Sequence, residues 1–196
     1  MKNEFLHKEY ELNYEQLRFY DSRQSSIFRY LFTLTSSVAT AQFALYKFFQ
    51  TPTQSYFRCH LFLSSIVFIA TLLLFLAMLQ NRLYFVFTAR QLNAIRGYLL
   101  EKEASEFQNN QLYTSVDFPA IKLSSVHTLQ LVGASFISSM FAASAMYAFM
   151  PALKETPSLG WSIFTFMIIV AAEIGFGYKY LDEQGKRTSD KAIHEK

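Results

Sequence analysis

Four long stretches of the chain contain no Asp, Glu, Lys or Arg, and this feature restricts its possible folds most. They cover residues 30–46, 59–81, 123–153 and 156–172. A helix needs about 20 mostly apolar residues to cross the hydrocarbon core of a bilayer. A chain of 196 residues, 52% of them hydrophobic, has too little polar sequence left to cover four such stretches in water. The sequence therefore predicts an all-helical, polytopic membrane protein.

The four stretches differ in how strongly they favour insertion. The second is the most apolar, and its Leu, Ile, Val and Phe side chains contribute about −4 to −8 kcal/mol toward insertion. The first is the weakest, because polar side chains such as Ser37, Thr40 and Gln42 interrupt it. We expect it to insert as a hairpin with the second span and to turn its polar side toward protein or water. The predicted spans are about 30–49, 59–80, 123–150 and 158–178.

Lysine and arginine are distributed unevenly along the chain. Of the 18, only Lys47, Arg58 and Lys154 lie in the connections after the first and third predicted spans. Loops that face the cytoplasm carry an excess of these residues. We therefore expect both termini and the middle connection to lie in the cytoplasm.

Residues 1–29 are predicted to be a cytoplasmic amphipathic helix continuous with the first span. No Pro precedes Pro52 and no Gly precedes Gly97, so nothing breaks a helix from about residue 4 to residue 49. Apolar side chains recur every three or four residues along one face of this helix. They are Leu6, Tyr10, Tyr14, Leu17 and Tyr20.

The second span is also predicted to continue as a helix into the cytoplasm, without a breaker between residue 80 and Gly97, and to resume helix character after Gly97 as far as Phe107. Two such extensions would pack together as a stalk below a four-helix transmembrane domain at 30–178. In the alternative, residues 5–28 lie flat on the inner leaflet. The rest of 81–122 is read as a polar connector, with Asp117 and Pro119 as start signals for the next helix.

The tail, residues 179–196, is predicted to lie in the cytoplasm and to be mobile beyond Leu181. We find no internal repeat and no low-complexity tract in the chain.

Small residues on the helix faces, and polar residues within the apolar stretches, are candidates for helix contact or gating. Small residues let helix backbones approach closely in lipid, within the chain or between copies. Glu173 either reaches the inner interface, pairs with a base such as Lys179, or serves an ion pathway, a gate or a subunit contact. Gln42 is read as an interhelical hydrogen-bonding residue or, like Glu173, as part of an ion pathway, a gate or a subunit contact. The full candidate set is Glu173, Gln42, Ser37, Thr40, Ala134, Ser138, Ala142 and Gly175.

The sequence contains no pattern typical of an active site. The four histidines lack metal-ligand spacing, and no Gly-rich phosphate loop or hydrolase motif occurs. The single cysteine, Cys59, allows no internal disulfide. The 18 basic residues are diluted by 15 acidic ones, which argues against direct nucleic-acid binding. We expect no catalytic residues, no metal and no cofactor.

The layout resembles small bacterial membrane proteins of anti-phage defence systems. Examples are the two- and four-span effector families linked to nucleotide signalling and the membrane component of the Kiwa system. The resembling features are the charged lead from Lys8-Glu9-Tyr10 to Phe19-Tyr20-Asp21-Ser22-Arg23, the four spans, and the amphipathic continuation of the second span. The resemblance implies an oligomer in the inner membrane that senses infection or perturbs the membrane.

The sequence thus predicts a non-enzymatic effector or sensor that works as a homo-oligomer in the lipid bilayer. One alternative is a channel or transporter subunit. Another is a membrane scaffold that recruits a cytoplasmic protein through residues 1–29 and 81–118.

Overall fold

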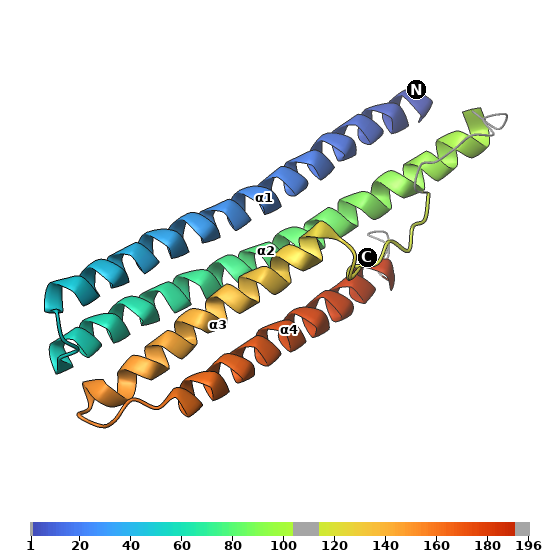
Figure 1. The fold of residues 1–196 in the computed structure, drawn as a ribbon. Helices are drawn as coiled ribbons and strands as arrows, with labels where there is room; N and C mark the ends of the chain where they lie inside the picture. The colour runs from blue at the N-terminus through green and yellow to red at the C-terminus, as the bar shows by residue number, and fades with distance from the viewer. Residues whose placement is uncertain (1, 104–113, 191–196) are drawn as a thin grey trace.

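A computed structural model of the chain describes residues 2–103 and 114–190, and all regular structure in these ranges is helical. The predicted all-helical class is therefore confirmed. The helices run alternately up and down, so the two short turns lie at one end of the molecule (Figure 1). The start of α1 and the end of α4 lie toward the other end. The four helices are α1 (Lys2–Phe49), α2 (Gln54–Glu103), α3 (Val126–Ala152) and α4 (Leu159–Asp190).

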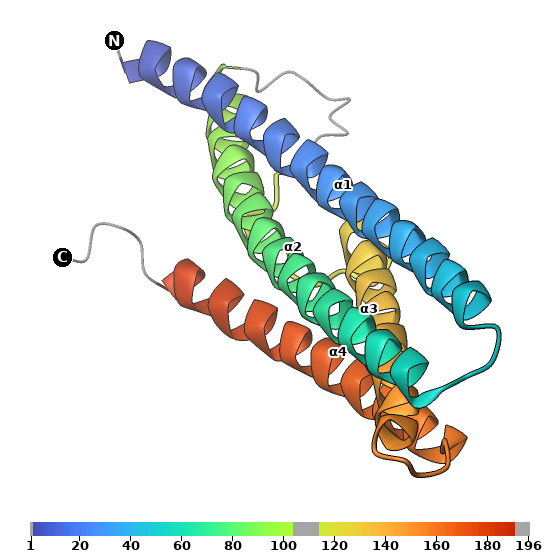
Figure 2. The same cartoon turned by 90° about the vertical axis from the view of Figure 1, so that its left-hand side faces the viewer.

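The first two helices are unusually long. α1 has 48 residues and α2 has 50, which corresponds to about 70–75 Å each at a rise of 1.5 Å per residue. The absence of a break in α1 confirms the predicted helix from about residue 4 to residue 49. α2 continues past Gly97, where an added Cβ would meet no atom within 4 Å. Figure 2 shows α1 and α2 side by side and extending beyond α3 and α4.

One face of α1 is buried or half-buried along α2, with spacings that alternate between four and three residues. This is the heptad pattern of paired helices. The predicted stripe is wrong at Tyr14, which is 44% exposed, because two successive steps of four residues carry a side chain past the contact line. The contact line is formed by Leu6, Tyr10, Asn13, Leu17, Tyr20, Gln24, Ile27 and Leu31.

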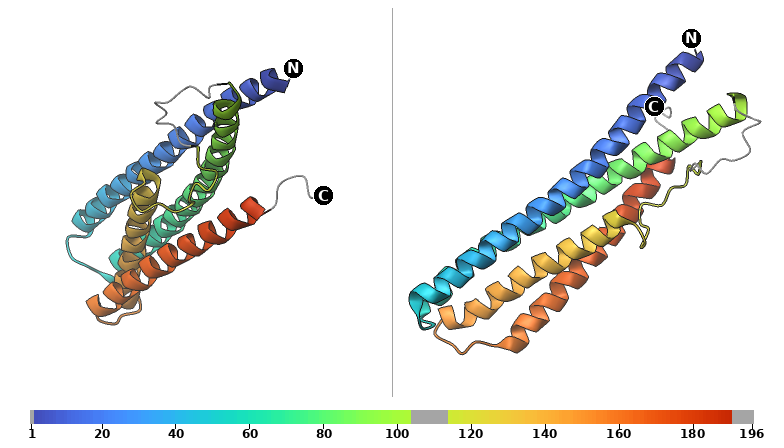
Figure 3. Two further views of the ribbon diagram at one scale, coloured as in Figure 1. Left: turned by 90° about the vertical axis from the view of Figure 1, so that its right-hand side faces the viewer. Right: turned by 45° about the horizontal axis from the view of Figure 1, so that its top comes forward.

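α2 and α3 lie between α1 and α4, as the views in Figures 2 and 3 agree. α1 packs mainly on α2, and α4 packs mainly on α3. Within the described residues, α1 and α4 do not touch. The main core lies where α2 and α3 meet their neighbours. Its buried residues include Leu31, Phe75, Met78, Leu79, Leu83, Val86, Leu131, Ala134 and Leu181.

The third helix begins later than the sequence indicated. α3 starts at Val126 with Ser125 as its N-cap, whose side chain accepts a 3.1 Å hydrogen bond from Thr128 N. The predicted start near Asp117 and Pro119 is wrong. Arginines of α2 instead bind the backbone carbonyls of this segment, which holds it out of a helix. The part of the predicted connector at 104–113 lies outside the described residues.

The prediction of a mobile tail beyond Leu181 is wrong as far as residue 190, because α4 continues as a helix to Asp190. Arg90 Nη1 of α2 donates a 2.8 Å hydrogen bond to Gly185 O, which ties this last part of α4 to α2. Residues 191–196 lie outside the described ranges.

Three helices are long and apolar enough to cross a membrane: α2, α3 and α4. This supports a membrane protein. Among the described residues, α1 does not reach the same apolarity, because hydroxyl and amide side chains occupy its second half. The first predicted span, 30–49, therefore stays a prediction.

Candidate functional site

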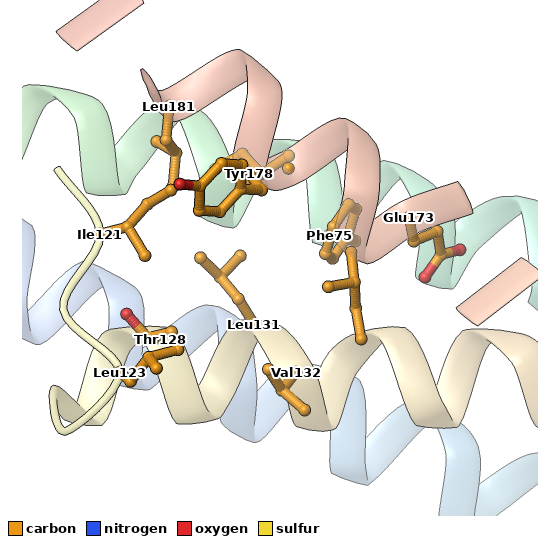
Figure 4. Close-up of a pocket in the computed structure, with 12 residues that line it drawn as sticks. Phe75, Ile121, Leu123, Thr128, Leu131, Val132, Glu173, Tyr178 and Leu181 are labelled. Carbon is orange, nitrogen blue, oxygen red and sulfur yellow. The ribbon is translucent and has the colours of Figure 1, made fainter. Parts of the chain in front are cut away.

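Glu173 of α4 points toward α3, inside the bundle (Figure 4). Only 6% of its surface is exposed. Ser138 of α3 donates a 2.8 Å hydrogen bond to Glu173 Oε1, whereas Oε2 has no hydrogen-bond partner within the described residues. The suggested pairing with Lys179 is not observed, since Lys179 Nζ lies 3.8 Å from an oxygen of Glu183. A neighbouring helix, rather than a base, therefore holds the carboxyl group.

A second hydroxyl of α3, that of the fully buried Ser135, also lies near this carboxyl, and the other surroundings of Glu173 are apolar. A cavity of about 100 Å³ lies between α2, α3 and α4, with Glu173 at one end and Leu181 toward the other (Figure 4). A second cavity of about 220 Å³ lies beside Glu173 between α2 and α4, next to Phe68 and Phe176. The hydroxyls of Ser138 and Ser135 are thus the polar groups near this carboxyl, and Ser138 makes the direct 2.8 Å hydrogen bond.

Replacing Ser138 with alanine should lower the free energy of unfolding by about 1–3 kcal/mol, because it leaves a buried carboxyl oxygen without its donor. Reversible unfolding in detergent micelles would measure the change. Ser22→Ala is the matched control, because Ser22 is an exposed serine on α1. We expect a change below about 0.5 kcal/mol for the control. Equal effects of the two substitutions would contradict an anchoring role for Ser138.

Gln42 takes part in a second polar cluster, which joins three helices. Gln42 Nε2 of α1 donates to Ser64 Oγ of α2 at 2.8 Å. The Ser64 hydroxyl lies 3.2 Å from Ser144 Oγ of α3, which is 2.9 Å from His60 Nε2. The interhelical hydrogen bond expected for Gln42 is therefore present. Ser64 and Ser144 were not singled out in the sequence, because nothing in their spacing links them to Gln42.

The two hydroxyl residues predicted on α1 face outward. Ser37 and Thr40 are exposed, as is Thr33 on the same face. Each hydroxyl donates to the carbonyl four residues earlier in α1, at 2.8–3.1 Å. Their hydrogen bonds are therefore satisfied within the helix, and the other helices of the chain leave this face uncovered.

The small residues predicted on α3 are buried within the chain. Ala134 is fully buried and Ala142 is 7% exposed. Gly175 of α4, in contrast, is exposed, and an added Cβ would meet no atom within 4 Å. Its predicted helix contact does not hold within the chain. Gly177 takes that place, because a Cβ there would lie 3.2 Å from Leu79 Cδ2 and two positions in a helix differ by about 200°.

Arg82 is the most prominent buried charge that the sequence did not identify as a site. It is 2% exposed. Its Nε donates to Ala120 O at 3.0 Å and its Nη2 to Pro119 O at 3.5 Å. The guanidinium also lies over the rings of Phe85 and Phe118, 5.4 and 5.7 Å from their centres. Within the described residues no carboxylate pairs with it.

His127 and Asp21 complete the polar arrangement around Arg82. His127 Nε2 lies 2.9 Å from Asp21 Oδ1, and His127 Nδ1 lies 3.5 Å from Arg82 Nη1. These residues come from α3, α1 and α2. Since Asp21 and His127 are separated by more than a hundred positions, no motif in the sequence indicates that they meet.

The described ranges contain no group of three or more His, Cys, Asp or Glu that could hold a metal ion. Comparison of the chain with protein-family models, with curated proteins and with solved structures finds no match. The function must therefore be inferred from the geometry of the chain itself.

Proposed function

We propose that the chain is a non-enzymatic protein of the bacterial inner membrane that works as a homo-oligomeric effector or sensor. It crosses the membrane four times: residues 30–49 of α1 form the first span, and the three apolar helices form the others. Both termini and the connection 81–122 lie in the cytoplasm. The distribution of Lys and Arg supports this orientation, and so does the position of the two short turns at one end of the molecule (Figure 1).

The cytoplasmic parts of α1 and α2 form a stalk in this proposal. Asn81 Nδ2 donates to Tyr20 O at 2.8 Å and to Gln24 Oε1 at 3.0 Å. Further along, Arg96 Nε donates to Tyr10 Oη at 3.1 Å. These contacts tie α1 to α2 on both sides of residue 20. They favour an upright helix pair over an α1 that lies flat on the inner leaflet.

The exposed hydroxyl face of α1 is the observation that carries the homo-oligomer. Thr33, Ser37 and Thr40 lie within the proposed first span, yet no helix of the chain covers them. A span of such low apolarity is poorly suited to contact lipid on this side. Small hydroxyl residues instead allow close approach of another helix in the membrane.

A second copy of the chain is the partner that this face fits best. A two-fold axis brings the same surface of each copy together, and small side chains with satisfied hydrogen bonds present no charge or unpaired donor to a copy of themselves. The resemblance to anti-phage effectors also implies an oligomer, which agrees with this choice. We therefore place α1 at the contact between copies.

The mass of the detergent-solubilised complex tests the proposal. We expect an oligomer for the native sequence and a shift to monomer for Ser37→Leu, because a bulky side chain would hold two α1 faces apart. Ala171→Leu is the matched control, since Ala171 is an exposed small residue on another spanning helix, α4. It should leave the mass unchanged. A strictly monomeric native protein would overturn the homo-oligomer, and an intact Ser37→Leu oligomer would remove α1 from the contact.

A scaffold that recruits a cytoplasmic protein is the second candidate, and one observation favours it. Large apolar side chains are exposed along the stalk part of α1, namely Phe5, Leu12, Tyr14 and Phe19. An effector or channel would change the ion conductance of the membrane when triggered, whereas a scaffold would leave the membrane potential intact. Membrane-potential recording during phage infection distinguishes them and also tests the defence setting.

A further inference from the structure

A cavity of about 370 Å³ lies where α1, α2 and the start of α3 meet the segment 118–127. Arg82, which comes directly after the apolar run 59–80, is one of its lining residues. This is the level at which α2 would leave the hydrocarbon in the proposed membrane orientation. The cavity is separate from the two apolar cavities beside Glu173, one of which Figure 4 shows, and it shares no lining residue with either of them.

Three cations and one carboxylate line the cavity: Arg82, Arg96, Lys122 and Asp21. The one carboxylate lies 2.9 Å from His127 and pairs with none of the three cations within the described residues. Buried Arg82 directs part of its guanidinium to backbone carbonyls, which carry no full charge. The cavity therefore has an excess of positive charge that the described part of the chain does not neutralise.

Two of the cations have hydrogen-bonding capacity left for a ligand. Arg96 donates from Nε to Tyr10 Oη, and its terminal nitrogens make no hydrogen bond to a described residue. The side chain of Lys122 is exposed and makes no hydrogen bond or ion pair there either. The cavity also borders the first turn of α3, at Ser125 and Val126, where the helix dipole favours a negative charge.

Apolar and aromatic side chains form much of the remaining cavity wall, beside the polar Asn93, Ser124 and His127. Leu17, Phe85 and Leu92 contribute to it from α1 and α2. Cations beside apolar surface fit a molecule that has an anionic head and an apolar remainder. A phosphate group matches the arginine fork and the helix end, because both donate several hydrogen bonds to its oxygens.

We propose that this cavity binds a phosphate-bearing anion with an apolar part, held by Arg96, Lys122 and the N-terminus of α3, with Arg82 as the buried charge behind them. The head group of an anionic phospholipid of the inner leaflet supplies this chemistry at the right depth. A soluble phosphate ester is the other source. The site does not depend on the oligomer, so the two proposals fail separately.

Native mass spectrometry of the full chain in a non-ionic detergent tests the site, with phosphatidylglycerol and phosphatidylcholine as probes. We expect phosphatidylglycerol to bind at least about tenfold more tightly, and Lys122→Gln to weaken it about tenfold, as loss of one charge-assisted contact predicts. Lys179→Gln is the matched control, because Lys179 is an exposed lysine on α4 outside the cavity. It should leave binding unchanged.

A second arm identifies the source of the phosphate. Inorganic phosphate and adenosine monophosphate are added to the same protein, and binding is followed by the shift in unfolding temperature. A shift with adenosine monophosphate that Lys122→Gln abolishes, without preference for phosphatidylglycerol, would assign the site to a soluble ligand and overturn the lipid source. The proposal is overturned if no probe binds selectively, or if Lys122→Gln and Lys179→Gln weaken binding equally.

Discussion

Replacing Arg82 with alanine is expected to lower the free energy of unfolding by about 3–5 kcal/mol, the largest effect of any single substitution considered for this chain. The change removes charge-assisted hydrogen bonds to Ala120 O and Pro119 O and leaves these carbonyls without their donor. It also removes a side chain that fills the space between the rings of Phe85 and Phe118. The connection before α3 would lose its attachment to α2.

Reversible unfolding in detergent measures this loss, and hydrogen exchange at residues 118–121 locates it. Arg58→Ala is the matched control, since Arg58 is an exposed arginine on the same helix, and should change stability by less than about 0.5 kcal/mol. Arg82→Lys keeps the charge but loses the planar fork, so we expect an intermediate value. Equal losses for Arg82→Ala and Arg58→Ala would show that the buried guanidinium does not hold the connection.

Replacing Gly177 with leucine is expected to destabilise the chain by about 2–3 kcal/mol, because it overpacks a close helix contact. The first added atom would already lie 3.2 Å from Leu79 Cδ2 and 3.4 Å from Phe75 Cζ. The rest of the leucine would have to enter the same space, so α4 would move away from α2.

Gly175→Leu provides a control with the opposite expected sign. An added Cβ there meets nothing within 4 Å, and replacing glycine within a helix removes a cost of about 0.5–1 kcal/mol. The control should therefore be neutral or slightly stabilising, as judged by the same unfolding transition. If both leucine variants lose the same stability, α2 and α4 do not make their close approach at Gly177.

The helices of this chain could largely be predicted from the sequence, because their signals are local. The absence of Pro before Pro52 and of Gly before Gly97 leaves α1 unbroken. α2 contains no Pro either, and it continues as a helix through Gly97. The small residues of α3 are also a local pattern. That pattern placed Ala134, Ser138 and Ala142 on one face, and the face is buried.

The errors occur where contacts distant in sequence decide the outcome. Asp117 and Pro119 are good local start signals, yet Arg82 and Arg90 bind the carbonyls around them. Likewise, a regular spacing of four favoured Tyr14 for the contact with α2. The pairing of the two helices selects Asn13 instead, with spacings of four and three.

The candidate site shows the same division. Glu173 and Ser138 could each be predicted as candidate site residues, since one is an acid within an apolar run and the other lies on a small-residue face. That they bond to each other depends on how α3 and α4 are rotated. Arg82, His127 and Asp21 come from three helices, and their meeting has no local signal at all.

The most direct test of the four-span arrangement is to find on which side of the membrane each end of α1 lies. Cys59 is the only cysteine, so Cys59→Ser gives a background in which single cysteines replace the exposed residues Ser22, Ser55 and Lys154 and the half-buried Asp182. A membrane-impermeant maleimide added to spheroplasts should label positions 55 and 154. Positions 22 and 182 should react only after the membrane is opened. Labelling of positions 22 and 55 from the same side would contradict the account, because α1 would then not cross the membrane.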